Sequence, residues 1–302
     1  MTHPTGRALS AGAFATLLLI ALMMGANHVA ARVAFNNGAD VATAVVFRSA
    51  VTALVIVALL AAQGVRVQFS ARHKRMLPLI GLLIGVQSLC LYSSVARLPV
   101  ALALLAFNTY PIWAALWSWA FYKQPPERPL LLAMPVILVG LALALDVFGA
   151  ASGLGAQGQW ARIGAGVGFA LAAGATFGLA MVMTQHEAGD VDGRVRTATT
   201  MTMAGLVALT MVVSQGGLQL PQAPAGWGGL FALTFLYGTA ITILFTVLPR
   251  LGVVGNSAIM NVEPVFALIL AWLILGQAIA PMQVLGALIV VGAVVTLGMR
   301  KR

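Results

Sequence analysis

Long apolar runs alternate with short polar connectors along almost the whole chain. A run of about 20 apolar residues is long enough to cross the hydrocarbon core of a bilayer as a helix. We count ten such runs, at residues 9–35, 40–62, 76–96, 98–122, 129–148, 161–184, 196–215, 227–248, 252–275 and 281–299. The pattern therefore predicts an all-α integral membrane protein with ten transmembrane helices and no separate soluble domain.

The composition excludes a soluble globular protein of this size. Apolar residues make up 61% of the 302 positions and charged residues only 8%, whereas a soluble domain carries about 25% charged residues. The mean hydropathy is +0.98. The first apolar run, after Arg7, is longer than the core of a signal peptide and lacks a convincing cleavage site, so we expect a retained first span.

The Lys and Arg residues predict the direction of the spans. The net charge is +10, but the basic residues are spread over short connectors and chain ends, which argues against a nucleic-acid partner. With a cytoplasmic N-terminus, all but four of the 17 Lys and Arg residues fall on the cytoplasmic side. The four others, at or near the outer face, are Arg32, Arg48, Arg97 and Arg162. This bias predicts that both termini are cytoplasmic.

Two stretches, 97–124 and 250–277, match without a gap at an offset of 153 residues. Eight of their 28 positions are identical, and these include an Arg, an Asn, a Pro, a Trp and a Gln in one register. The identical pairs are Arg97/Arg250, Leu98/Leu251, Val100/Val253, Asn108/Asn261, Pro111/Pro264, Ala114/Ala267, Trp119/Trp272 and Gln124/Gln277. The chain therefore looks like two copies of one unit.

Each unit contains five of the predicted spans, which is an odd number. The second unit must then cross the membrane in the opposite sense to the first. We expect two inverted five-helix repeats around a central cavity, with 1–149 as the first repeat and 150–302 as the second. The first spans of the two units match weakly, as Gly25-Ala26-Asn27 against Gly174-Ala175-Thr176.

Glu263 is the most costly residue in the predicted membrane region, because it lies near the centre of the span 252–275. A charged side chain at that depth costs at least about 2.5 kcal/mol, and such residues usually mark a transport pathway. A structural ion pair with Arg32 or Arg48, or a permanently protonated acid, is the alternative. The counterpart of Glu263 in the first repeat is Tyr110. Tyr110 and Trp113 lie on one helical face, so a carboxylate and aromatic rings are expected to line the cavity and to suit an ammonium group on an apolar body.

A proline follows each of these two positions and predicts a break or hinge in its helix. Pro111 and Pro264 cannot donate a backbone hydrogen bond, so each leaves a carbonyl free one turn earlier. Asn108 and Asn261 lie three residues before the prolines. They either satisfy the loosened turn, which we favour, or contact substrate.

Other polar residues within the spans complete the candidate substrate site. His28 is either a proton site or a neutral side chain bonded to a neighbouring helix. Asn256 shares a helical face with Glu263. The candidates in this group are Asn27, His28, Gln87, Tyr92, Tyr237 and Asn256.

These features resemble the EamA-type branch of the drug/metabolite transporter superfamily. The resemblance rests on the ten spans in two inverted halves, the Asn-x-x-Pro of the fourth and ninth spans, and the ending EPVFALILAWLILGQAIAPMQVLGALIVVGAVV at 263–295. Gln124 and Gln277 depart from the family pattern, which often has an acidic residue there. The resemblance implies a multi-pass protein of the bacterial inner membrane that exports amino acids or related metabolites.

The sequence thus predicts a secondary transporter that exports small metabolites, amino acids first, by alternating access. The partners expected are a small-molecule substrate and membrane lipid; the oligomeric state and the choice between proton coupling and facilitated diffusion stay open. Export of cationic drugs is the alternative, and a non-transport intramembrane enzyme or receptor is a more distant one. No Walker A sequence, HExxH motif or cluster of Cys and His is present, so no cofactor and no metal is expected.

Overall fold

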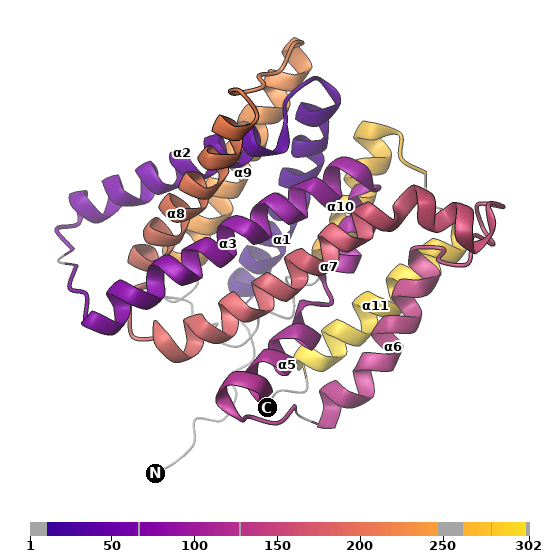
Figure 1. The fold of residues 1–302 in the computed structure, drawn as a ribbon, viewed down its shortest axis with the longest axis horizontal. Coiled ribbons are helices and arrows are strands. Elements are labelled where there is room, and N and C mark those ends of the chain that lie inside the picture. The colour runs from indigo at the N-terminus through magenta and orange to yellow at the C-terminus, as the bar shows by residue number, and fades with distance from the viewer. Residues whose placement is uncertain (1–10, 66, 127, 247–261, 279, 300–302) are drawn as a thin grey trace.

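The computed structural model describes residues 11–65, 67–126, 128–246, 262–278 and 280–299, and within these ranges the regular structure is entirely helical (Figure 1). The helices are α1 (Ala11–Asn36), α2 (Val41–Ala62), α3 (Ala71–Arg97), α4 (Val100–Phe107), α5 (Tyr110–Tyr122), α6 (Arg128–Ala144), α7 (Gly155–Glu187), α8 (Gly193–Ser214), α9 (Pro224–Thr246), α10 (Glu263–Leu275) and α11 (Pro281–Met299).

Seven helical segments of the described chain are long and apolar enough to cross a membrane. They cover α1, α2, α3, the combined α4 and α5, α7, α8 and α9. Three shorter apolar helices lie in α6, α10 and α11. These segments overlap the apolar runs that the sequence pattern marks as spans, and α3 and α7 extend beyond their runs at both ends.

The predicted span 98–122 is two helices in the structure. α4 ends at Phe107 and α5 begins at Tyr110, with Asn108 and Thr109 between them. Pro111 lies in the first turn of α5, where its missing N–H would have no partner inside the helix in any case. α10 begins in the same way, with Glu263 at its start and Pro264 in its first turn.

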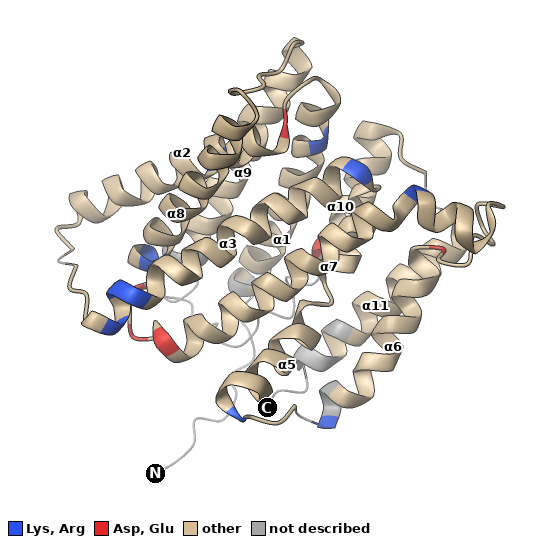
Figure 2. Cartoon of the chain, viewed as in Figure 1, with Lys and Arg blue, Asp and Glu red and all other residues tan. Residues whose placement is uncertain are grey.

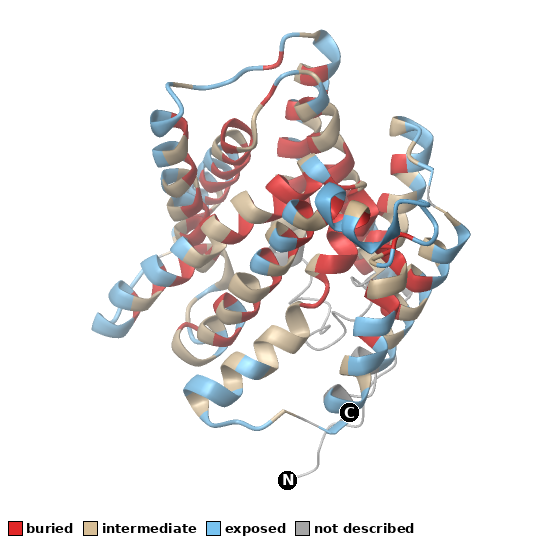
Figure 3. Cartoon of the chain, turned by 45° about the vertical axis from the view of Figure 1, so that its right-hand side comes forward, coloured by how far each residue is buried: buried red, intermediate tan, exposed pale blue. Residues whose placement is uncertain are grey.

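Charged residues keep to the helix ends and connectors over most of the described chain (Figure 2). Large apolar side chains instead point outward along the helices. Leu132, Val213 and Phe235 are each about 70% exposed, at 74%, 72% and 68%. A surface of this kind suits hydrocarbon and not water. Buried residues gather where the helices face one another (Figure 3).

Helices from the two parts of the chain pack against each other. α1 contacts α9 and α10, while α3 contacts α7 and α8. α2 lies along α8, and α6 pairs with α11 at one side of the molecule (Figure 1). The short α4 is enclosed by these layers, since every residue from Val100 to Ala106 is buried. Because α4 has no polar face, it can be enclosed on all sides without burying an unpaired polar side chain.

Glycines allow the closest helix approaches. A Cβ atom at Gly178 of α7 would lie 2.7 Å from the Ala114 nitrogen and 3.0 Å from the Tyr110 oxygen of α5. A Cβ atom at Gly25 of α1 would lie 3.1 Å from both the Ala267 nitrogen and the Glu263 oxygen of α10. A side chain at Gly178 would therefore push the two helices apart, whereas one at Gly25 would fit only tightly.

Aspartate caps the starts of α2 and α8. Asp40 accepts a hydrogen bond from the Thr43 nitrogen at 2.9 Å, and Asp192 accepts one from the Arg194 nitrogen at 2.8 Å. The Arg194 guanidinium also donates to the Asp192 carboxylate and lowers the pKa of that carboxyl to about 2. Each cap satisfies a free backbone donor at a helix N-terminus.

Candidate functional site

Polar side chains from five helices meet inside the packed helices and form one group, here called the polar cluster. α1, α2, α3, α9 and α10 each contribute at least one member. The members are Asn27 and His28 of α1, Arg48 of α2, Gln87, Ser88 and Tyr92 of α3, Tyr237 of α9 and Glu263 of α10.

Glu263 is paired with His28. Its Oε1 atom lies 3.2 Å from His28 Nε2, and the side chains are 20% and 4% exposed. Because α10 begins at Glu263, the carboxylate also lies at the positive end of the helix dipole. An acid held in this way is less costly in the membrane than an isolated one.

The alternative expectation, an ion pair of Glu263 with Arg32 or Arg48, is not what the structure has. Arg32 donates to the backbone oxygens of Val95 and Leu98, at 2.6 and 3.2 Å. These carbonyls lie at the C-terminal end of α3, where backbone oxygens lack helical partners and attract a cation.

Tyr92 joins the Glu263–His28 pair to the rest of the polar cluster. Its ring meets the His28 ring edge-on with 5.6 Å between centroids, and its hydroxyl donates to Asn27 Oδ1 at 2.9 Å. Tyr92 and Asn27 are fully buried. The Nδ2 atom of Asn27 and the Nδ1 atom of His28 are buried without a hydrogen-bond partner.

Arg48 is a member of the polar cluster that sequence reasoning missed. The side chain is 3% exposed, and its guanidinium carbon lies 4.8 Å from the centre of the Tyr92 ring and 4.0 Å from that of Tyr237. Its Nη2 atom donates to Ser88 Oγ at 2.7 Å, and Ser88 Oγ in turn lies 3.4 Å from Gln87 Oε1. The distribution of Lys and Arg predicted that Arg48 lies at or near the outer face. Arg48 is, however, the eighth residue of α2 and so lies about 10 Å along that helix.

Tyr110 belongs to a neighbouring aromatic group. Its ring lies 5.1 Å from that of Phe177 and 5.7 Å from that of Phe107, between centroids. The phenol is also close enough to the Glu263 carboxylate to interact with it electrostatically. Trp113, in contrast, packs beside Gly178 of α7.

The predicted asparagines are placed differently. Asn108 ends α4 and is 8% exposed, so it lies at the break between α4 and α5. Its backbone N–H donates to the Leu104 oxygen at 2.9 Å. Asn256 and Asn261 lie outside the described residues.

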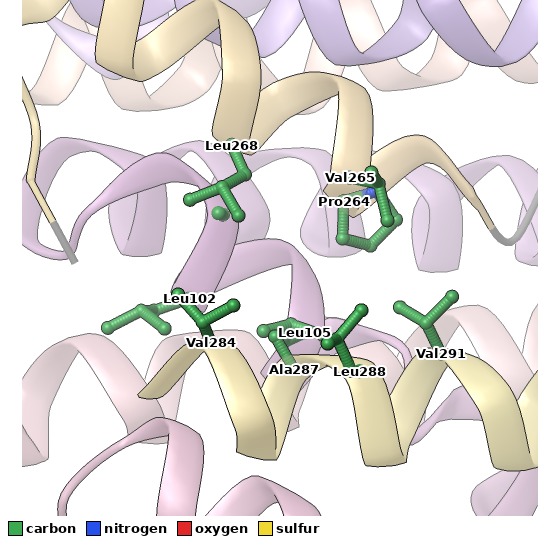
Figure 4. A pocket seen from close by; sticks show the side chains of 10 residues that line it. Leu102, Leu105, Pro264, Val265, Leu268, Val284, Ala287, Leu288 and Val291 are labelled. Atoms are coloured by element: carbon green, nitrogen blue, oxygen red, sulfur yellow. The ribbon is translucent and has the colours of Figure 1, made fainter. Parts of the chain in front are cut away.

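A small apolar pocket lies elsewhere, between α4, α10 and α11 (Figure 4). It has about 40 Å³ of internal space and is lined by residues such as Leu105, Pro264 and Leu288. Its lining side chains are all apolar, so it offers no partner for the charged groups of an amino acid. The described residues include no group of three His, Cys, Asp or Glu side chains that could hold a metal ion.

The fold and the polar cluster are those of a multi-pass membrane protein that keeps a charged interior within an apolar exterior. The family model described as "EamA-like transporter family" matches residues 11–145 and again residues 164–299. The chain therefore belongs to the EamA-like transporter family.

Curated relatives agree with this assignment, and a solved structure shares the fold. The threonine/homoserine exporter RhtA of Escherichia coli (strain K12) is 26% identical over 248 residues, which cover 78% of this chain and 76% of the exporter. The protein of the same name from Escherichia coli O157:H7 gives the same values. A solved crystal structure superposes with a TM-score of 0.61 over 95% of this chain and 99% of its own, at 16% identity, which shows a shared fold.

Proposed function

We propose that this protein is a secondary exporter of small metabolites, amino acids first, that works by alternating access. The observation that carries the proposal is the buried Glu263–His28 pair, formed between α1 and α10 and surrounded by further polar side chains. Such groups are expensive in a membrane and persist where they serve a substrate or ion pathway. The family assignment supports transport, and the name of RhtA supports an amino acid as substrate.

We further propose that the ten spans form two inverted repeats, residues 1–149 and 150–302. Helices α5 and α10 support this, because each has 13 residues and they are offset by 153. Their ends also correspond: α5 is followed by Lys123 at φ 58° and α10 by Gly276 at φ 64°.

Gly25 and Gly178 support the same symmetry. They are 153 residues apart. Gly25 approaches Glu263 and Ala267 at the start of α10, and Gly178 approaches Tyr110 and Ala114 at the start of α5. The contacted residues also correspond at an offset of 153. A two-fold axis exchanges such contacts. The first spans therefore align Gly25 with Gly178, one turn beyond the Gly174 that sequence matching suggested.

Alternating access follows from this arrangement. If the two halves can exchange conformations, the site between them opens to one side or the other at similar energy. We place the protein in a bacterial inner membrane with both termini cytoplasmic, because that orientation puts most Lys and Arg residues inside.

Export of cationic drugs is the second candidate, because the Glu263 carboxylate would attract a cation. Arg48 lies in the same polar cluster, however, and its charge repels one. A substrate with both an ammonium and a carboxylate group matches both charges. We therefore rank amino acids above cationic drugs.

The test is flux in proteoliposomes loaded with labelled threonine, homoserine and a panel of other amino acids, with and without a pH gradient. We expect flux of at least one amino acid, which Glu263→Gln reduces at least tenfold, and which Glu187→Gln, the same change at the end of α7, leaves unchanged. Absence of flux for every amino acid refutes the substrate class. Equal flux in the wild type and Glu263→Gln removes the proposed site, and flux of organic cations alone favours the second candidate.

A further inference from the structure

Arg48 is a buried cation without a carboxylate partner among the described residues. Its described partners are the Ser88 hydroxyl and the faces of the Tyr92 and Tyr237 rings. Aromatic faces attract a cation, but they do not saturate the five N–H donors of a guanidinium. The Nε atom of Arg48 is buried and has no hydrogen-bond partner.

None of the acids that the structure describes is left to neutralise this charge among the packed helices. The chain contains seven Asp and Glu residues in total. Glu263 is already paired with His28. The other six lie in the connectors or at helix ends of the sequence: Asp40, Glu127, Asp146, Glu187, Asp190 and Asp192.

Further buried donors without a partner lie on two of the helices that form the polar cluster, α1 and α2. Thr52 and Ser49 lie on α2 beside Arg48, one turn and one residue further on, and both hydroxyls are buried without a partner. Thr52 Oγ1 faces Gly238 of α9, and Ser49 faces Gly205 of α8. The amide nitrogen of Asn27, whose oxygen is held by Tyr92, is also unsatisfied. A group rich in donors and carrying one positive charge is suited to a single anion.

We propose that Arg48 binds the carboxylate group of the transported substrate. The inference rests on the proposed amino-acid export and names the part of the substrate that this region recognises. A guanidinium can hold a carboxylate by two parallel hydrogen bonds, which gives orientation as well as attraction. The negative charge that the protein does not supply is then supplied by the substrate.

Tyr92 relates this position to the acid of the polar cluster. One ring is contacted by the Arg48 guanidinium and by the His28 ring, and His28 is paired with Glu263. The Arg48 guanidinium and the His28 ring therefore both contact Tyr92, and the acid Glu263 lies beyond His28. A carboxylate at Arg48 leaves the ammonium group of an amino acid on the side of the Glu263–His28 pair.

The wild-type protein gives the first test, with three labelled compounds that differ in one group: threonine, its carboxamide and the corresponding amine that lacks the carboxyl carbon. We expect threonine to be transported with a kcat/KM at least tenfold above that of the other two. Equal transport of the three compounds overturns the carboxylate proposal while leaving amino-acid export intact. Absence of flux for all amino acids instead refutes the proposed function itself.

Substitution then assigns the preference to Arg48. Arg48→Gln is expected to raise the KM for threonine about 10- to 100-fold, because a pair of charge-assisted hydrogen bonds is lost. The carboxamide loses only a neutral hydrogen bond, so its kcat/KM should fall much less and the preference for threonine should shrink at least several-fold. Arg97→Gln is the matched control, because Arg97 also lies over a ring, Phe169 at 4.8 Å, and donates to a backbone oxygen. An unchanged preference for threonine in folded Arg48→Gln overturns the assignment.

Arg48→Lys keeps the test decisive where Arg48→Gln does not fold. An ammonium group retains the charge but cannot form two parallel bonds to a carboxylate. We expect the KM for threonine to rise at least several-fold, again with a smaller change for the carboxamide. A wild-type KM in folded Arg48→Lys contradicts the proposed contact.

Discussion

The approach of α7 to α5 at Gly178 makes a sharp prediction. In Gly178→Ala the new methyl group would lie 2.7 Å from the Ala114 nitrogen and 3.0 Å from the Tyr110 oxygen. Both are backbone atoms of a helix, so neither can move alone. The two helices must separate by several tenths of an ångström, and the neighbouring side chains must follow.

The expected magnitude is a balance of two terms. Overpacking of this kind costs about 1–3 kcal/mol, and alanine is better than glycine in a helix by about 1 kcal/mol. Gly178→Ala should therefore destabilise by about 0–2 kcal/mol. At Gly25 the equivalent distances are 3.1 Å, so the two terms should nearly cancel. Gly168, exposed on α7 with nothing near its Cβ position, should gain up to about 1 kcal/mol on substitution by alanine.

The assay is the apparent melting temperature of purified protein in one detergent, read from the folded fraction after heating. The predicted order is Gly168→Ala highest, Gly25→Ala near the wild type and Gly178→Ala lowest. At about 2–4 °C per kcal/mol, the two ends of the series should differ by several degrees. If Gly178→Ala melts with or above Gly168→Ala, α5 and α7 do not approach as closely as described, and the reasoning fails.

Three further predictions concern polar positions. Stability measurements on His28→Ala, Glu263→Gln and the double variant should show a coupling of about 1–3 kcal/mol, since the pair shares one charge-assisted hydrogen bond; additive effects would contradict the pairing. Lys123→Gly should raise the melting temperature, by about 0.5–1 kcal/mol in stability, because Lys123 has φ 58°, which glycine adopts without strain; a lower melting temperature would contradict this. Asp192 has a pKa of about 2 beside Arg194, below its value of about 4 in an unfolded chain, so its stabilisation is present above about pH 4 and is lost toward pH 2. The melting temperature of the wild type should then fall more over this window than that of Asp192→Asn. The difference in the free energy of unfolding should stay below about 1 kcal/mol for so exposed a group. An equal fall in both melting temperatures would count against the assigned bond.

Most of the helices could be predicted because the bilayer imposes their length. The apolar runs overlap every helix that the structure describes, although α3 and α7 begin five and six residues before the runs at 76–96 and 161–184. The break between α4 and α5 was harder to place. Pro111 signals a break, but a proline is also favoured in the first turn of a helix, so the chain interrupts the helix at Asn108 and Thr109 instead of at the proline.

The candidate site was predicted in part. Glu263 stood out because a lone acid in an apolar run is costly wherever its partner lies. The partner itself depends on which helix faces α10, which spacing along one chain does not determine. His28 was named as a polar candidate, while the partners considered for Glu263 were Arg32 and Arg48.

Arg48 shows how a signal present in the sequence was misread. Its charge was counted with the outer connectors because it lies nearer to that end of its span. A count along the helix places it about 10 Å beyond the start of α2, too deep for the charge to be dismissed as a connector residue. Charge bias is a good guide to orientation and a poor guide to depth.

The two halves differ most where a substrate would need them to differ. The backbone contacts of Gly25 and Gly178 correspond at an offset of 153. The contacted residues nevertheless differ in chemistry, because Gly25 lies against Glu263 and Gly178 lies against Tyr110. At the same offset Arg48 corresponds to Met201, whose sulfur accepts from the Tyr237 hydroxyl at 3.7 Å. A matched backbone can keep the energies of two exchanged conformations similar. A site for a zwitterion instead needs one anionic and one cationic side chain, each present in only one half. The symmetric packing therefore serves the motion that we propose, and the unmatched side chains serve recognition.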